Sequence, residues 1–453
     1  MKIFFYRHKK KQQLRMLWCV FSFICTLYFL NSGFARDYDF IVVSDPFLKK
    51  TPIAVTEFKT SNGSSVEIED GKTARQILVD ALNFTGYLKS MNPEAFLSNP
   101  AQTGIKLGQI NFRDWTGIGA DLLVTGGITV ENNHVVLELR LIDTFSQKLV
   151  VGNRYSGSRA KLREMIHRFC GDISYALTRN RGVFDSRIAF VSTVNGNKEI
   201  FTCDFDGQSI EQVTAHKSIS LSPSLSSDGQ FLAYVTYSRG RPEIFIRNFA
   251  SKKNVIVNHK GMNISPAWMP GQKTLAASLS FTGDQEIYLL TLEGEMIKRI
   301  TNSWGIDVSP SFSPDGRKIA FTSKRTGTPQ IHIMDIATQD VHRLTFKGRN
   351  NTSPAWSPDG RKIAYVGIED NGINIYIMDV DSGMPVQLTM DAGDNEDPAW
   401  SPDGSMLAFT STREGRISRL YVMNASGTDQ RRLLKMDGKQ AQPNWSLLWN
   451  KDN

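Results

Sequence analysis

The sequence predicts a mainly β protein whose C-terminal part is a closed six-bladed β-propeller, preceded by a smaller α/β domain. Three observations predict this fold: a phrase that recurs every 43–45 residues, short strand-like segments within each repeat, and an array that begins and ends with complementary parts of one repeat. We expect a signal peptide at residues 1–35, an N-terminal α/β domain with an extended N-terminal arm at 36–180, and the propeller at 181–453.

The repeated phrase is clearest at residues 309–321, SPSFSPDGRKIAF, and at 353–365, SPAWSPDGRKIAY. The prolines of successive copies stand at positions 223, 266, 310, 354, 398 and 443, so the spacings are 43, 44, 44, 44 and 45 residues. This period is typical of a four-stranded propeller blade.

Local chemistry predicts four strands in each repeat. Pro-x-aromatic-Ser forms the inner strand, and Ser-Pro-Asp-Gly forms a tight turn in which Pro fixes φ and Asp and Gly tolerate the bend. An Ile-Ala-aromatic strand follows, as in 319–323, then a third strand such as 375–379, and a fourth that ends near Leu-Thr. The recurrence of Asp315, Asp359 and Asp403 at one place in the repeat indicates turn residues rather than catalytic carboxylates.

The two ends of the array predict how the ring closes. The last copy contains Pro443 and Trp445 but ends before an Ile-Ala-aromatic strand, whereas Ile188-Ala189-Phe190 has no preceding copy of the phrase. We therefore expect pairing of the N- and C-terminal strands of the array, which completes one blade and removes exposed sheet edges. Five whole blades and one shared blade make six, and no further unit for a seventh is present.

The N-terminal domain has no repeat and is expected to have the order β-α-β-β-β-α. We expect a strand at 51–58, a helix capped by Thr73, a buried strand at 119–127, a hairpin at 134–142 and 148–155, and a helix whose apolar face runs from Leu162 to Leu177. Residues 179–184 would link it to the propeller.

The N-terminus has the pattern of an export signal. Six basic residues and no acidic one precede the apolar run Met16–Leu30, and small residues follow, which predicts cleavage between Ala35 and Arg36. A retained N-terminal anchor is the alternative, and either places the body outside the cytoplasm. Cleavage would reduce the formal charge from +8 to +2, a balance that does not favour nucleic-acid or anionic-membrane binding.

We find no pattern that predicts an enzyme, a cofactor or a metal. Gly-x-Ser-x-Gly and His-Glu-x-x-His are absent, and the seven histidines have no ligand-like spacing. The mature chain would keep Cys170 and Cys203, which we expect to be separate buried thiols, although export would permit a disulfide.

The repeats, the segment Gly119-Ala120-Asp121 and the junction at 182–190, GVFDSRIAF, resemble those of the TolB family, periplasmic propeller proteins of the Tol-Pal system. The resemblance spans essentially the whole mature chain. It implies a non-catalytic role in outer-membrane integrity and in constriction during cell division, with two partners: the lipoprotein Pal and the periplasmic domain of TolA.

The resemblance also implies two binding regions. The Pal-binding mouth would be formed by loops between the last strand of one blade and the first strand of the next, with the residues His216, Ser218, Met262, Asn263, Trp304, Asp307, Asn350, Asn351, Asp394, Asn395, Lys439 and Gln440. The TolA-binding arm would be Arg36, Asp37, Tyr38, Asp39, Phe40 and Ile41. We expect a periplasmic monomer with no membrane span after signal removal.

Two other functions remain open from the sequence. A propeller-based hydrolase or a glycan-binding protein would need a deep channel with convergent acids. A scaffold with unrelated partners would tolerate charge reversal in the mouth loops.

Overall fold

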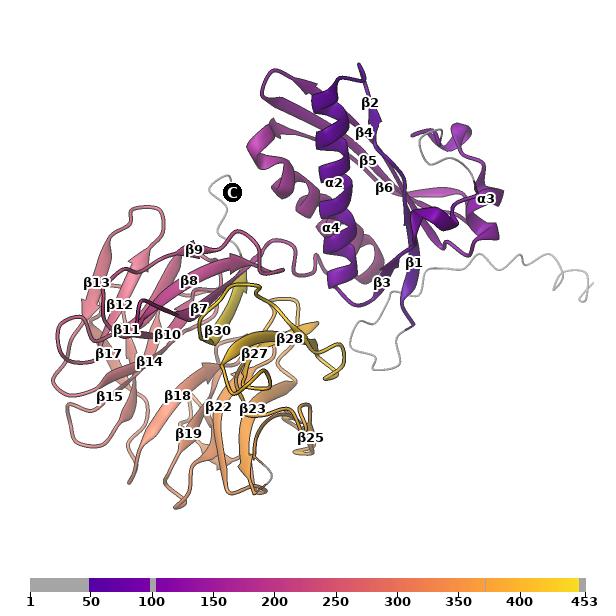
Figure 1. Ribbon diagram of the computed structural model, residues 1–453. Helices are drawn as coiled ribbons and strands as arrows, with labels where there is room; N and C mark the ends of the chain where they lie inside the picture. The colour runs from indigo at the N-terminus through magenta and orange to yellow at the C-terminus, as the bar shows by residue number, and fades with distance from the viewer. Residues whose placement is uncertain (1–48, 98–102, 371, 448–453) are drawn as a thin grey trace, which may run out of the picture. The chain divides into compact units, whose positions relative to one another are not determined.

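The computed structural model describes residues 49–97, 103–370 and 372–447 (Figure 1). The predicted signal peptide, its cleavage site and the predicted arm Arg36–Ile41 lie outside the described residues. No helix in the described part of the chain is both long and apolar enough to span a bilayer.

The N-terminal domain is a mixed sheet with two long helices on one face. Its strands are β1 (Thr51–Val55), β2 (Lys59–Thr60), β3 (Leu88–Ser90), β4 (Leu122–Glu131), β5 (His134–Asp143) and β6 (Lys148–Ser158), and its helices are α2 (Ser65–Phe84), α3 (Phe112–Gly117) and α4 (Leu162–Thr178). Short 3₁₀ turns lie at Pro93–Ala95, Leu107–Gln109 and Arg159–Lys161. The strand order is β3-β1-β4-β5-β6, with β2 also paired to β4. Figure 1 shows α2 and α4 side by side.

The hairpin and the closing helix confirm the sequence-based expectation, but the predicted start of the first helix is wrong. Thr73 lies inside α2, which begins after the N-cap Ser64, whose Oγ accepts a hydrogen bond from the Glu67 amide at 3.3 Å. Gly71 also lies inside α2, where the helix approaches the sheet: a Cβ at this residue would stand 3.4 Å from Ile128 Cγ2. β2, β3 and α3 are additional to the predicted order.

Glu67 connects the start of α2 to the sheet. Its buried carboxylate accepts hydrogen bonds from Ser61 Oγ, Asn62 N and Val130 N at 2.7, 3.0 and 3.0 Å. Burial by itself would raise the pKa of this carboxyl, but the three donors outweigh burial and hold the pKa below its usual value.

We predict that Glu67→Gln lowers the free energy of unfolding by about 1–2 kcal/mol at pH 7, because an ionised acceptor is replaced by a neutral amide. A carboxyl with a lowered folded pKa stabilises the fold above its unfolded pKa and loses this effect as the pH falls through the folded value. Urea unfolding between pH 7 and pH 3 should therefore show less acid destabilisation in the variant. Parallel pH profiles for the two proteins would contradict the role of Glu67.

The propeller has six four-stranded antiparallel blades. Blades 1–5, each with its inner strand first, are β10 (Ser220–Leu225), β11 (Phe231–Thr236), β12 (Glu243–Asn248) and β13 (Asn254–Val257); β14 (Asn263–Trp268), β15 (Leu275–Leu279), β16 (Glu286–Leu290) and β17 (Met296–Arg299); β18 (Asp307–Phe312), β19 (Lys318–Ser323), β20 (Gln330–Asp335) and β21 (Val341–Arg343); β22 (Asn350–Trp356), β23 (Lys362–Glu369), β24 (Gly372–Asp379) and β25 (Pro385–Gln387); and β26 (Asn395–Trp400), β27 (Met406–Ser411), β28 (Arg419–Asn424) and β29 (Arg431–Arg432). Blade 6 consists of β30 (Gln440–Leu447), β7 (Ser186–Val194), β8 (Asn197–Asp204) and β9 (Glu211–Gln212).

The Ser-Pro-Asp-Gly segments are turns, as predicted. In blade 3, Ser313 Oγ donates to Asp315 Oδ1 at 2.6 Å, the Arg317 amide donates to the same oxygen at 3.1 Å, and the Lys318 amide donates to Ser313 Oγ at 2.9 Å. The hydrogen bonds from Ser313, the larger cause, and from the Arg317 amide lower the pKa of Asp315. The same bonds recur around Asp359 and Asp403, so these acids shape the turns between the inner and second strands.

Blade 6 closes the ring by pairing β30 with β7, as the two ends of the array predicted (Figure 1). Trp445 Nε1 donates to Ser186 Oγ at 2.7 Å across this pair. β30 also bonds to blade 1: the Leu225 amide donates to Asn444 Oδ1 at 2.7 Å, and the Ser222 amide donates to Gln442 Oε1 at 2.8 Å. The C-terminal strand therefore joins the first and last parts of the propeller.

Cys170 and Cys203 are separate, fully buried thiols, as expected. Burial raises the pKa of both thiols, so neither is a ready thiolate nucleophile.

We predict that Asn444→Ala lowers the free energy of unfolding by about 1–2 kcal/mol, because the Leu225 amide loses its acceptor inside the ring closure. Asn302→Ala, at an exposed position between blades 2 and 3, is the matched control and should change it by less than about 0.5 kcal/mol. Urea unfolding followed by circular dichroism measures both. Equal losses in the two variants would contradict a specific role of Asn444 in closure.

Candidate partner-binding face of the propeller

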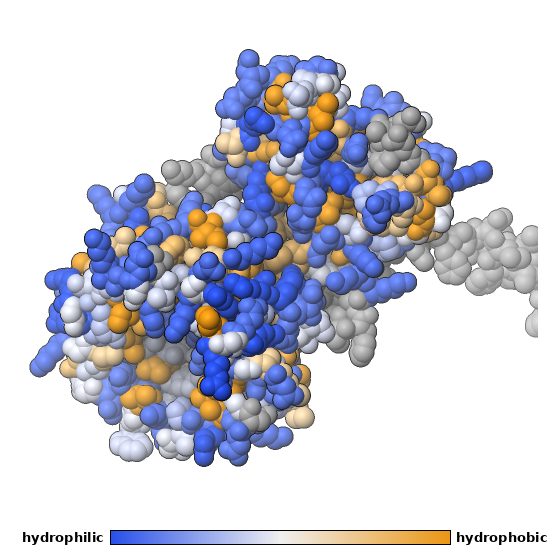
Figure 2. Space-filling view, in the orientation of Figure 1, coloured by the Kyte–Doolittle hydropathy of each residue, from blue (hydrophilic) through white to orange (hydrophobic). Residues whose placement is uncertain are grey.

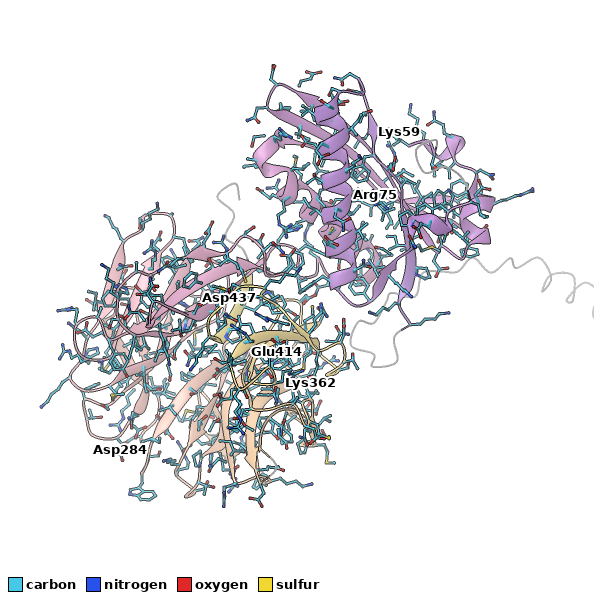
Figure 3. The ribbon with its side chains drawn as sticks, viewed as in Figure 1. Lys59, Arg75, Asp284, Lys362, Glu414 and Asp437 are labelled. Carbon is cyan, nitrogen blue, oxygen red and sulfur yellow. The ribbon has the colours of Figure 1, made fainter. Side chains whose placement is uncertain are left out.

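Six loops connect the outer strand of one blade to the inner strand of the next. They are residues 213–219, 258–262, 300–306, 344–349, 388–394 and 433–439. Because strands alternate in direction within a blade, these loops share one face of the propeller with the loops between second and third strands. We call this surface the loop face. Figure 3 labels Asp284, Glu414 and Asp437, which belong to its loops.

Five of the twelve residues expected at the Pal-binding mouth are buried beneath this face. They are the first or second residues of inner strands in blades 2–6: Asn263, Asp307, Asn351, Asn395 and Gln440. Each has at most 2% of its surface exposed, so their side chains are not available to a docked partner. We call these five residues the buried loop anchors.

The buried loop anchors hold the loops that precede them. Asn395 Nδ2 donates to the Gly393 carbonyl at 2.9 Å, while its Oδ1 accepts from Ser411 Oγ at 2.8 Å and from Arg413 at 3.1 Å. In blade 6, Gln440 Nε2 donates to the carbonyls of Asp437 and Gly438 at 3.0 and 2.6 Å.

Blades 2–4 repeat this arrangement with other partners. Asn263 Nδ2 donates to the His259 carbonyl at 2.8 Å, and Asn351 Nδ2 donates to the Lys347 carbonyl at 2.7 Å. Asp307 instead accepts hydrogen bonds from Ser303 Oγ and Arg325 at 3.0 and 2.7 Å. The loop face therefore rests on polar side chains that satisfy loop carbonyls and donors in the interior.

The other seven expected residues reach the surface to different extents. His216, Ser218, Met262 and Asn350 are half-buried, and Trp304, Asp394 and Lys439 are exposed. His216 Nε2 lies 3.0 Å from the hydroxyl oxygen of Tyr234 in blade 1, and this hydrogen bond fixes the position of the His216 ring. Trp304 has 79% of its surface exposed.

Sequence reasoning missed several exposed apolar side chains of the loop face, of which Phe346 and Met390 are the most exposed. Phe346 and Met390 directly follow the Leu-Thr pairs that end blades 3 and 4, and 73% and 62% of their surfaces are exposed. Together with Trp304 they stand in three consecutive loops, and we call these three residues the apolar arc. On the face of the molecule shown in Figure 2, the surface is largely hydrophilic and the apolar residues form small separate areas. The shared offset from Leu-Thr was the signal in the sequence that could have identified them.

Basic residues predominate in the six loops around the apolar arc. The loops contain Lys217, Lys260, Lys347, Arg349, Lys435 and Lys439, against the acids Asp391, Asp394 and Asp437. Exposed aromatic and apolar side chains surrounded by charged residues are typical of a protein-protein interface.

A cavity of about 500 Å³ lies between the six inner strands, on the side of the turns that follow them. The residue before each repeat proline lines it in a left-handed conformation, with φ between 50° and 54°: Ser222, Ser265, Ser309, Ser353, Asp397 and Gln442. The inner strand of every blade has a register shift at this place. Burial raises the pKa of Asp397, the one acid among the six. No group of three potential metal-ligating acids, histidines or cysteines occurs in the described ranges.

We predict that Asn395→Ala lowers the free energy of unfolding by about 1–3 kcal/mol, because the buried Ser411 hydroxyl, Arg413 and the Gly393 carbonyl lose their partner. The neighbouring substitution Asp394→Ala removes an exposed side chain and should change it by less than about 0.5 kcal/mol. Thermal and urea unfolding of the two variants measures this difference. A larger loss in Asp394→Ala would contradict the assignment of Asn395 as a loop anchor.

Comparisons with known proteins agree with this architecture over most of the chain. Residues 175–449 match the family described as "TolB beta propeller domain", and residues 40–150 match "TolB amino-terminal domain". The chain is 59% identical to the "Tol-Pal system protein TolB" of Desulfosudis oleivorans over 409 residues, 90% of this chain and 93% of the relative. It is 44% identical to the "Protein TolB homolog" of Chlorobaculum tepidum over 252 residues, 55% of this chain and 56% of the relative.

A solved structure supports the same conclusion. The crystal structure of TolB from Acinetobacter baumannii superposes with a TM-score of 0.77 at 29% sequence identity, covering 88% of this chain and 97% of that one. With both domains in the same order as in these relatives, the chain belongs to the TolB family of Tol-Pal system proteins.

Proposed function

We propose that this protein is a non-catalytic periplasmic component of the Tol-Pal system that binds the lipoprotein Pal on the loop face. The observation that carries this proposal is the apolar arc, which exposes two aromatic side chains and a methionine from three consecutive loops of a TolB-family propeller. Aromatic and methionine side chains are enriched in the centres of protein interfaces, where their burial contributes most of the binding energy.

The charges of the loops support a partner with an acidic contact surface. Lys347 and Arg349 lie in the same loop as Phe346. Lys260 lies in the loop next to that of Trp304, and Lys217 lies one loop further around the ring. Charged groups at the rim of an interface accelerate association and orient the partner, while the apolar centre contributes more of the affinity. The surface of Pal that docks here would be acidic around an apolar patch.

The buried loop anchors support the proposal by fixing the loops before a partner arrives. A loop held by interior hydrogen bonds loses less conformational entropy on binding than a free one. Because the anchors are buried, the residues expected to contact Pal are the apolar arc and the accessible residues of the other loops, among them His216, Met262 and Lys439.

TolA would bind the segment Arg36–Ile41, which lies outside the described residues. This part of the proposal depends on the family relationship and on the sequence of the segment. Removing Arg36–Ile41 should abolish calorimetric binding to the periplasmic domain of TolA, and unchanged binding would contradict it. Through both partners the protein would support outer-membrane integrity and constriction during cell division.

We predict that Trp304→Ala and Phe346→Ala each weaken binding of the soluble domain of Pal at least tenfold, which corresponds to about 1.4 kcal/mol or more. Isothermal titration calorimetry at a fixed salt concentration measures the affinity. Because both side chains are exposed, neither change should lower the melting temperature by more than about 2 °C.

Ile297→Ala is the control for this experiment. Ile297 lies on the outer strand β17 and has 53% of its surface exposed, so it is an exposed apolar residue outside the loop face. It should leave the affinity for Pal unchanged. Normal binding by both arc variants, or an equal loss in Ile297→Ala, would contradict docking on the apolar arc.

A further inference from the structure

One blade carries an arginine at a position that is apolar in all the others. The third strand of each blade contains an Ile or Leu, such as Ile375 in blade 4, and the position concerned lies three residues after it. In blades 2–6 the residue at this position has at most 5% of its surface exposed: Leu290, Met334, Met378, Met423 and Cys203. In blade 1 the corresponding residue of β12 is Arg247, which is half-buried.

This position belongs to the packing between neighbouring blades. Met334 packs with residues of blade 2, Met378 with residues of blade 3, and Met423 with residues of blade 4. Phe245 lies two residues before Arg247 on the same face of β12, and it packs against Ala189 and Ile200 of blade 6. Arg247 therefore stands where a hydrophobic residue would complete the contact between blades 6 and 1.

A cavity of about 490 Å³ opens at this place. Its cationic lining comes from three separate segments: Arg187 on β7, Arg247 on β12, and Lys252 in the turn between β12 and β13. Glu211 on β9 is the acidic residue of the lining, and it pairs with Arg187 at 3.3 Å. The lining thus has three cations and one carboxylate.

The two arginines retain unused hydrogen-bonding capacity. Nε of Arg187 and Nε of Arg247 are both buried and have no hydrogen-bond partner within the described part of the chain. The Arg187 side chain is only 21% exposed, whereas Glu211 is 63% exposed, so the carboxylate lies toward solvent and leaves the interior of the cavity cationic. A buried N–H donor without an acceptor is costly, and an oxyanion would accept hydrogen bonds from the two Nε atoms.

The rest of the lining is largely apolar. Val213, Leu225 and Phe249 contribute side chains from blades 6 and 1. A ligand held by its anionic group at the arginines would place its remaining atoms against these side chains. Cavities with an apolar wall and a few charged groups bind small amphiphilic molecules in this manner.

We propose that the cavity between blades 6 and 1 binds a carboxylate or phosphate group attached to a short apolar chain. Arg247 and Arg187 donate hydrogen bonds to the oxyanion, Lys252 adds positive charge at the entrance, and Phe249 contacts the apolar part. Most of this site lies away from the loop face, because Gly229 and Lys252 belong to turns after the inner and third strands, at the other ends of the strands; Val213 alone among the lining residues comes from a loop of that face.

The test is binding of hexyl phosphate, hexanoate and inorganic phosphate to the full chain and to Arg247→Met, measured by isothermal titration calorimetry at low salt. Methionine is the residue of three other blades at this position, so the variant should fold with an unchanged or higher melting temperature. Saturable binding of at least one hexyl ligand by the natural protein and a loss of at least tenfold in Arg247→Met are expected. Whichever hexyl ligand binds more tightly identifies the anionic group.

Lys318→Met is the matched control. Lys318 is exposed on β19 at the repeat position of Arg187, and its removal also lowers the net charge by one. It should leave the affinity unchanged. No saturable binding of either hexyl ligand, or equal binding by Arg247→Met, would overturn the site. Inorganic phosphate binding as tightly as hexyl phosphate would overturn the role assigned to the apolar wall.

Discussion

The pairing of β30 with β7 is the constraint on which the propeller depends. Without this C-terminal strand, blade 6 would lack its inner strand, and the Leu225 amide in blade 1 would lack the acceptor Asn444. Closure fixes the six blades in a ring, so each blade can bury its apolar faces against two neighbours. It also fixes where the six loops between blades lie, and hence the shape of the loop face.

In the loop face, one set of residues stabilises the loops and another set is exposed to a partner. The buried loop anchors satisfy the polar groups of the loops from below, as Asn395 does for Gly393, whereas Trp304, Phe346 and Met390 extend from the same loops into solvent. Exposed positions supported in this way can change to suit a partner without loss of the fold, because the hydrogen bonds that hold the backbone involve other residues. Arg247 differs from both sets, because it is a charged residue at a position between blades where three other blades have a methionine.

The repeat made the propeller predictable from the sequence, since a period of 43–45 residues with fixed turn chemistry leaves few alternatives. The turn acids and the shared blade were predicted for the same reason. The start of α2 was not, because both Ser64 and Thr73 are residue types that cap helices, and the sequence alone did not show that Ser64 is the N-cap. Spacing located the mouth loops but could not show which way their side chains point. Asn263 and Gln440 were therefore expected at a surface from which they are buried, while Phe346 was overlooked.

Hydrogen-deuterium exchange of the protein with and without the soluble domain of Pal tests the central claim most directly, since it reports on every loop at once. Docking on the loop face predicts slower exchange at residues 300–306, 344–349 and 388–394, with little change in the Ser-Pro-Asp-Gly turns at the other ends of the strands. Protection confined to those turns, or no protection at a saturating concentration of Pal, would contradict the account.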